Sequence, residues 1–156
     1  MRYQTPGSRR LPGVWYDTRM FYRRIRRRRK ARPRSKTQQL HYLEHKEAAR
    51  RVVLVRLEHF NQHYGLTYGR VSIKCQRRCW GSCSSLGNLN FNYRILFLPP
   101  ELQDYIIVHE LCHLAELNHG PQFWQLVAQM MPQYQQYKNA LKVYEGKVVT
   151  GQLEVK

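Results

Sequence analysis

The chain has 156 residues, which suits one globular domain and is short for two. It contains no apolar run long enough to span a bilayer and no secretory signal core, which disfavours membrane-spanning and exported classes. The formal net charge of +17 is uneven, because residues 1–36 hold 14 Lys and Arg against one acid. A strongly basic arm therefore precedes a mildly basic domain, residues 37–156.

The arm lacks a sustained apolar period, and its basic run should repel itself and stay flexible until it meets a polyanion. The positive charge of residues 23–36 therefore predicts non-specific binding to nucleic acid or to an acidic surface. The arm is Arg-rich and acid-poor like an organelle transit peptide, but its low serine content and lack of clear amphipathicity argue against that interpretation. An alternative from another class is a nucleic-acid-binding protein whose folded domain is only a non-catalytic scaffold.

Four cysteines, Cys75, Cys79, Cys83 and Cys112, could in principle form two disulfides. Without a secretory segment, the reducing cytoplasm is the default location and free thiols are the expected state. The first three are spaced four residues apart, which matches no common zinc or iron–sulfur pattern. Buried structural thiols are therefore favoured over a second metal site.

Residues 37–64 are predicted to form one long helix that stops at Gly65, because apolar residues recur at near-helical spacing. The apolar positions used are Leu40, Leu43, Ala48, Val52, Val55 and Tyr64. The period then changes to alternation, with Gly81 and Gly87 supplying turns. The alternating pairs are Val71/Ile73, Leu89/Phe91 and Ile95/Phe97, which predict three or four short antiparallel strands.

Pro99 and Pro100 end the strand region and open a helix predicted over residues 101–117, with Asn118 closing it in the left-handed conformation. A short helix from Pro121 to Met131 and a last helix around residues 134–144 should follow. Residues 37–156 are thus predicted to form one α+β domain.

The segment His109-Glu110-Leu111-Cys112-His113 is an H-E-x-x-H motif on a strongly predicted helix. Two histidines four residues apart share one helix face and can bind one zinc ion. Glu110 lies about 100° further round the helix, where it could act as the general base on a metal-activated water. Hydrogen-bonded surface histidines without a metal are the alternative, but they leave Glu110 unexplained.

His119 follows His109 by ten residues and can return as a third ligand once the helix has turned. In the metzincin pattern a glycine follows the second histidine by three positions, whereas here Glu116 stands there, so the turn is predicted later, at Asn118. Glu116 is itself an alternative ligand, because it shares the helix face of the two histidines. His119 is favoured, since three ligands on one straight helix rarely converge on a tetrahedral ion. One Zn²⁺ per chain, held by His109, His113 and His119, is therefore expected.

Several stretches between Arg70 and Tyr144 carry a family resemblance. They read Trp80-Gly81-Ser82-Cys83-Ser84-Ser85, Gly87-Asn88-Leu89-Asn90-Phe91-Asn92-Tyr93-Arg94, Asp104-Tyr105-Ile106-Ile107-Val108-His109-Glu110-Leu111-Cys112-His113 and Asn118-His119-Gly120-Pro121-Gln122-Phe123-Trp124. Together they resemble the YgjP-like family of predicted zinc metallopeptidases, which is related to the M48 and SprT-like zincins. Members usually place an arginine directly before the Trp-Gly-Ser-Cys stretch, whereas here Cys79 intervenes and Arg78 is nearest.

The resemblance implies a compact zincin-like α+β domain with a small antiparallel sheet, a long N-terminal helix, an H-E-x-x-H helix and C-terminal helices. It also implies that His109, His113 and His119 are zinc ligands and that Glu110 is the catalytic acid/base. The expected function is a cytoplasmic zinc-dependent metallopeptidase-like hydrolase. Members often carry a longer β-rich N-terminal segment, which the basic arm replaces here.

The family carries two functional labels, metallopeptidase and UTP pyrophosphatase, and therefore two substrate classes, peptides and nucleotides. Arginines in or beside the predicted strands could clamp phosphates, Arg78 and Arg94 first among them and then Arg70 and Arg77. The same arginines could equally serve solubility and ion pairing. An edge strand beside the site could instead bind an extended peptide by strand addition. The motif favours the peptidase, with a metal-dependent pyrophosphatase as the alternative.

Overall fold

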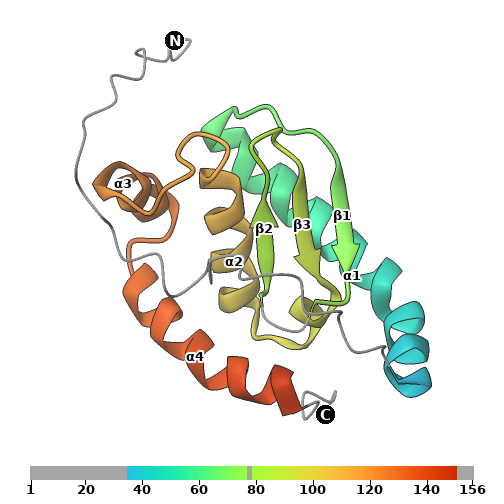
Figure 1. Ribbon diagram of the computed structural model, residues 1–156. Helices are drawn as coiled ribbons and strands as arrows, with labels where there is room; N and C mark the ends of the chain where they lie inside the picture. The colour runs from blue at the N-terminus through green and yellow to red at the C-terminus, as the bar shows by residue number, and fades with distance from the viewer. Residues whose placement is uncertain (1–34, 77–78, 151–156) are drawn as a thin grey trace, which may run out of the picture.

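The computed structural model describes residues 35–76 and 79–150, and for residues 145–150 only the course of the backbone (Figure 1). In chain order the elements are α1 (Lys36–Tyr64), β1 (Val71–Lys74), β2 (Gly81–Cys83), β3 (Leu89–Asn92), the 3₁₀ helix η1 (Tyr93–Phe97), α2 (Pro100–Cys112), α3 (Pro121–Met130) and α4 (Tyr134–Thr150). The α+β class is confirmed. The basic arm predicted over residues 1–36 lies almost wholly outside the described ranges. No described helix is both long and apolar enough to cross a membrane.

Helix α1 confirms the predicted long helix, but it buries a different face from the one predicted. The Ser35 side chain accepts a hydrogen bond from the backbone N–H of Gln38 at 3.2 Å, and Gly65 ends the helix with a φ of 60°. The buried residues are Ala49, Val53, Leu57 and Phe60, whereas the predicted positions Leu40 and Val55 are both 67% exposed. The prediction failed because apolar residues occupy more than one side of this helix.

The sheet is mixed, so the wholly antiparallel arrangement that was predicted is wrong. Its order is β1-β3-β2, in which β2 runs antiparallel to β3 but β1 runs parallel to it. The chain therefore passes from β1 to the far edge of the sheet, forms β2 and returns to insert β3 in the middle. Alternating apolarity cannot reveal this, because side chains alternate between faces in both kinds of pairing.

Two local predictions in the sheet region also need correction. Ile95 and Phe97 were expected in a strand but lie in η1, because the Asn92 side chain accepts a hydrogen bond from the Arg94 N–H at 3.2 Å and caps a helical turn. Gly87 occupies a turn with a φ of 72°, as predicted. Gly81 does not, since it is the first residue of β2 and its φ is not positive.

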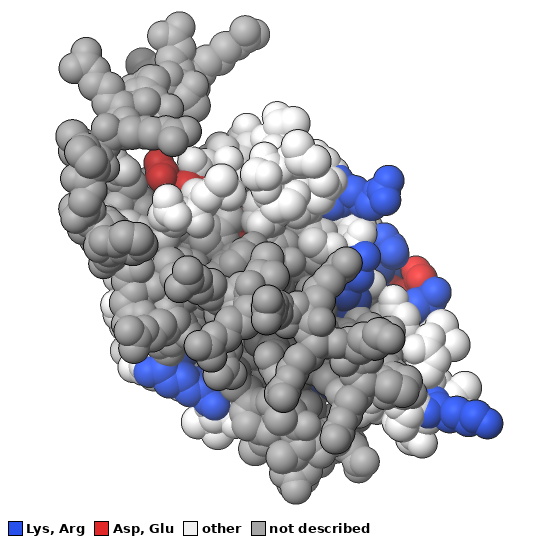
Figure 2. Space-filling model, viewed as in Figure 1, with Lys and Arg blue, Asp and Glu red and all other residues white. Residues whose placement is uncertain are grey.

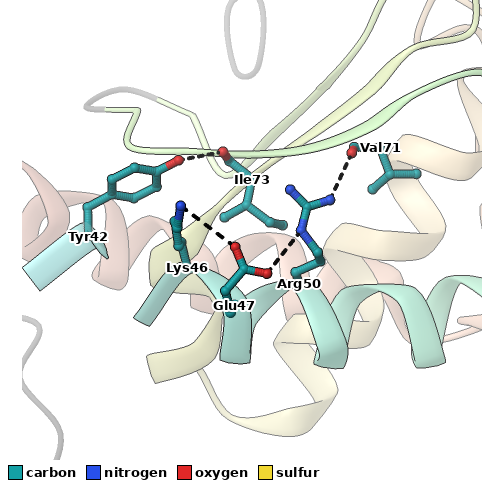
Figure 3. Close-up of polar contacts among 6 residues, drawn as sticks. All are labelled: Tyr42, Lys46, Glu47, Arg50, Val71 and Ile73. Atoms are coloured by element: carbon teal, nitrogen blue, oxygen red, sulfur yellow. Dashed lines mark hydrogen bonds and ion pairs between the residues drawn. The ribbon is translucent and has the colours of Figure 1, made fainter. Parts of the chain in front are cut away.

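The outer edge of β1 is covered by side chains from α1 (Figure 3). The Tyr42 hydroxyl donates to the Ile73 carbonyl at 3.0 Å, and the Arg50 guanidinium donates to the Val71 carbonyl at 3.4 Å. Glu47 holds Arg50 in place with an ion pair of 3.4 Å. These contacts occupy backbone acceptors that would otherwise be available to another strand.

Helix α2 is the centre of the domain, with β2 on one side and α3 and α4 on the other (Figure 1). Nine of its 13 residues are buried, as expected for a helix that is apolar on nearly every side. It ends at Cys112, five residues before the predicted end at 117. Asn118 is not left-handed, because no described residue other than glycine has a positive φ. The early end lets the chain bend back toward α2 before His119.

The two C-terminal helices pack on α2 and are confirmed in position. Helix α3 ends one residue before the predicted Met131 and buries Phe123 and Val127, and α4 buries Leu141. Fully burying such a side chain contributes about 1.5–3 kcal/mol. Both helices therefore fix the segment that carries His119 against the motif helix.

Lys and Arg side chains gather on the side of the molecule where α1 and β1 lie (Figure 2). Helix α1 supplies Lys46, Arg50, Arg51 and Arg56. Part of this charge is neutralised within the domain, since Arg56 forms an ion pair of 3.0 Å with Asp104 of α2.

Candidate metal centre

The three histidines singled out in the sequence converge on one point. His109 and His113 lie one turn apart at the end of α2, and His119 returns to them from the loop before α3. The His109 Nε2 atom is 3.2 Å from His113 Nε2 and 3.0 Å from His119 Nε2. Within the described chain these side chains form a cluster whose candidate ligand atoms all lie within 4.8 Å of one another.

The bend between His113 and His119 is tighter than predicted and comes earlier. Backbone hydrogen bonds from Leu114 to Leu111 and from Ala115 to Cys112 tighten the chain directly after α2. The His113 Nδ1–H donates to the Glu116 carbonyl at 2.9 Å, which leaves Nε2 as the lone-pair nitrogen of that ring. Glu116 thus contributes a backbone acceptor, and its carboxylate is not part of the described cluster.

All three imidazoles are electrically neutral near physiological pH. Burial, and then the neighbouring His113 and His119, hold the pKa of His109 well below its usual value. Burial also lowers the pKa of His113, and burial together with His113 and Lys138 lowers that of His119 to about 4. Neutral imidazole is the form that binds metal, so the lowered pKa values keep the three histidines in the form that can act as ligands.

Aromatic rings of α3 fix the orientation of the imidazoles. The Phe123 ring is fully buried and stacks on His113 with a centroid distance of 4.5 Å. It also contacts the other two histidine rings, at 4.8 Å for His109 and 4.7 Å for His119. The Trp124 indole N–H donates to the His119 carbonyl at 3.1 Å. Phe123, which the sequence marked only as an apolar helix residue, therefore packs beneath the whole cluster.

Glu110 is enclosed between α2 and β2. Its side chain is 2% exposed, and burial raises the pKa of its carboxyl group to about 8. Its Oε2 atom has no hydrogen-bond partner among the described residues. The carboxyl group also raises the pKa of two thiols that burial has already raised, Cys79 and Cys83, each to about 11. Cys79, Cys83 and Gly81 therefore surround the carboxylate, and none of them was predicted to do so.

A cavity of about 370 Å³ opens beside His113 and His119. Cys83, Ser84 and Ser85 line one side of it, at the end of β2, and Leu117 and Asn118 line the other. None of these lining side chains is charged at neutral pH. No disulfide joins the four cysteines, all of which the structure describes, and none of them belongs to the described ligand cluster.

Of the arginines proposed as phosphate ligands, the two that the structure describes, Arg70 and Arg94, do not line the cavity beside the histidines. Arg94 is 6% exposed, lies 5.0 Å from the Tyr93 ring and donates to the Gln76 carbonyl at 3.4 Å. Arg70 is exposed next to β1, on the opposite edge of the sheet from β2. Arg77 and Arg78 lie outside the described residues. The described arginines thus give no support to a nucleotide site.

Three imidazoles converge beside a small sheet, and the helix that ends at two of them also carries a buried glutamate, an arrangement that could hold a metal ion as metallopeptidase sites do. The chain belongs to the YgjP-like family, since residues 17–144 match the model for the YgjP-like metallopeptidase domain. The family implies a bound metal ion, and the residues present fit one.

Two solved structures share the fold. The metallopeptidase zymogen abylysin of Pyrococcus abyssi is similar with a TM-score of 0.55 and 24% identity, over 59% of this chain and 93% of that chain. The metallopeptidase zymogen jannalysin of Methanocaldococcus jannaschii is similar with a TM-score of 0.51 and 21% identity, over 60% of this chain and 95% of that chain. No curated protein matches the chain.

Proposed function

We propose that this chain is a zinc-dependent peptidase in which His109, His113 and His119 bind the ion and Glu110 is the general base. The single observation that supports this most strongly is the convergence of three imidazoles, two of them at the end of the helix that also carries the buried Glu110. His109, Glu110 and His113 are buried and His119 is partly buried, and burial of polar side chains is costly unless hydrogen bonds or metal coordination compensate for it.

The distances between the nitrogens favour a tetrahedral ion. Zn–N bonds of about 2.0–2.1 Å at tetrahedral angles hold two ligand nitrogens about 3.3 Å apart. The two separations from His109 Nε2, 3.2 and 3.0 Å, are close to this value, and all three candidate ligand atoms lie within 4.8 Å of one another. Three imidazoles and no thiolate make zinc the first choice, and they leave a fourth position for water.

Glu110 is the residue that moves the proton. When bound, zinc would polarise the scissile carbonyl and lower the pKa of a water toward about 7. Glu110 takes a proton from the attacking water through Oε2, the atom without a hydrogen-bond partner in the described part of the chain, and then passes it to the leaving amine. Burial holds the pKa of this carboxyl near neutrality, where a general base works efficiently.

The outer edge of β2 is the edge at which an extended peptide could add. Gly81 and Cys83 on it are buried, so a peptide would reach it from the cavity at Cys83, Ser84 and Ser85. The Asn92 N–H donates to the Trp80 carbonyl and the Ser84 N–H to the Asn88 carbonyl, so the backbone groups of Gly81 and Cys83 face away from β3. No described strand pairs with that edge. The opposite edge of the sheet is occupied by Tyr42 and Arg50, which leaves β2 as the edge for strand addition.

The test compares zinc-loaded wild-type protein with Glu110→Gln on a quenched-fluorescence peptide library, an unfolded protein and UTP. We expect the wild type to cleave peptide bonds. The Glu110→Gln variant should retain one zinc per chain and lose about 10²–10⁴-fold in kcat, as expected for removal of a general base. Hydrolysis of UTP without any peptide cleavage would favour the pyrophosphatase alternative instead. Full peptidase activity in Glu110→Gln would refute the role of the glutamate.

A further inference from the structure

Gly81 is the residue of β2 that lies directly against the catalytic carboxyl group. A Cβ atom at this position would lie 2.5 Å from Glu110 Cγ, 2.6 Å from Oε1 and 2.7 Å from Cδ. Carbon atoms in favourable contact are about 3.5–4.0 Å apart. No side chain other than hydrogen therefore fits between the β2 backbone and the Glu110 carboxyl group as it is placed here.

The backbone conformation does not explain the glycine. The described glycines with positive φ are Gly65 and Gly87, and Gly81 is not among them. Alanine can adopt a backbone conformation without a positive φ, such as that of Gly81. Replacing glycine by alanine there would ordinarily stabilise a protein, because alanine restricts the unfolded chain. A glycine inside a strand instead indicates the close approach of another group, which here is Glu110.

Glu110 has little room to move away from a larger residue. It is 2% exposed and lies between α2 and β2, with the thiols of Cys79 and Cys83 close enough to interact with its charge. Its Oε2 atom has no hydrogen-bond partner in the part of the chain that the structure describes. No hydrogen bond to Oε2 from the described residues fixes the orientation of the carboxyl group. Close packing against the β2 backbone at Gly81 restrains it instead.

We propose that Gly81 is a positioning residue for the general base: its missing side chain forms the slot against β2 that holds the Glu110 carboxyl group in place. The inference rests on the proposed peptidase function for its catalytic consequence, and on the contact distances for its structural part. Any side chain at position 81 displaces the carboxyl group, and a displacement of about 1 Å can lower turnover about 10²-fold.

The catalytic test uses zinc-loaded Gly81→Ala. We expect kcat on a cleaved peptide to fall about 10²-fold while KM and the zinc content of one per chain remain unchanged. Gly120→Ala is the matched control, because Gly120 has a φ of −76° and a Cβ there would meet nothing within 4 Å. Unchanged kcat in Gly81→Ala would overturn the proposal.

The structural test is a double-mutant cycle read by urea unfolding, which needs no activity. Gly81→Ala should lower the unfolding midpoint of the zinc-loaded wild type, but not that of Glu110→Ala, in which the obstructing atoms are gone. Should Gly81→Ala alone fail to fold, the Gly81→Ala/Glu110→Ala variant should still fold. Equal destabilisation in both backgrounds would overturn the proposal. A wild type that cleaves no peptide would refute the proposed function. The double-mutant cycle needs no activity, so it would still show whether Gly81 packs against the Glu110 carboxyl group.

Discussion

Replacing Glu110 by Gln should stabilise the zinc-free protein, and the gain should increase with pH. Burial raises the pKa of Glu110 from 4.5 to about 8, so between these values the folded chain holds a proton that the unfolded chain has released. The free energy of unfolding of the wild type therefore falls as pH rises through this window and levels off above about pH 8. Glutamine does not titrate, so the variant avoids this loss.

The size of the effect follows from the pKa difference. Each unit corresponds to about 1.4 kcal/mol, so the gain on Glu110→Gln should reach about 3 kcal/mol at pH 7 and nearly 5 kcal/mol above pH 8. The three histidines of the cluster, whose pKa values are lowered, change the stability mainly below about pH 6.5. Because both proteins contain these histidines, their contribution cancels in the difference.

The assay is urea unfolding with a metal chelator at pH 5, 6, 7 and 8, followed by circular dichroism. The difference between the two proteins should grow by about 1.4 kcal/mol per pH unit and then level off. Glu58→Gln is the control, because Glu58 is exposed on α1 and water solvates its carboxylate in both states. A difference of the same size at every pH would show that the Glu110 carboxyl group is not desolvated and would refute the reasoning.

Three further predictions concern the ligands, the packing and the arm. His119→Ala should lose zinc while Glu116→Ala retains it, as measured by elemental mass spectrometry after dialysis; the reverse pattern would make Glu116 the third ligand. Phe123→Ala should cost about 3–5 kcal/mol in urea unfolding and weaken zinc affinity, because the ring packs beneath all three histidines; unchanged affinity would contradict this. Deleting residues 1–34 should abolish salt-dependent binding to nucleic acid and leave kcat/KM unchanged, whereas undiminished binding would exclude the arm as the basic site.

The parts of the fold that depend on local sequence could be predicted. The long helix ending at Gly65, the helix opened by Pro100 and the helix opened by Pro121 are all present, because capping residues and helical periodicity act over a few residues. The motif histidines converge for the same reason, since positions four apart in a helix share a face.

The parts that depend on distant contacts could not be predicted. The parallel pairing of β1 with β3 depends on the path of the chain, which alternation does not encode. The buried face of α1 is chosen by what packs against it, so Val53 rather than Val55 is buried. Gly81 was taken for a turn residue, because its contact with Glu110 joins positions far apart in the sequence. Phe123 gave the same apolar signal as any core residue.

The most direct test of the central claim is the zinc content of purified protein after dialysis against metal-free buffer, measured per chain by elemental mass spectrometry. His59→Ala, which changes an exposed histidine of α1, is the control and should bind zinc like the wild type. The account predicts about one zinc per chain in both, and none in His109→Ala. A folded wild-type protein that contains no zinc and takes up none when zinc is added would contradict the metal centre and the peptidase built on it.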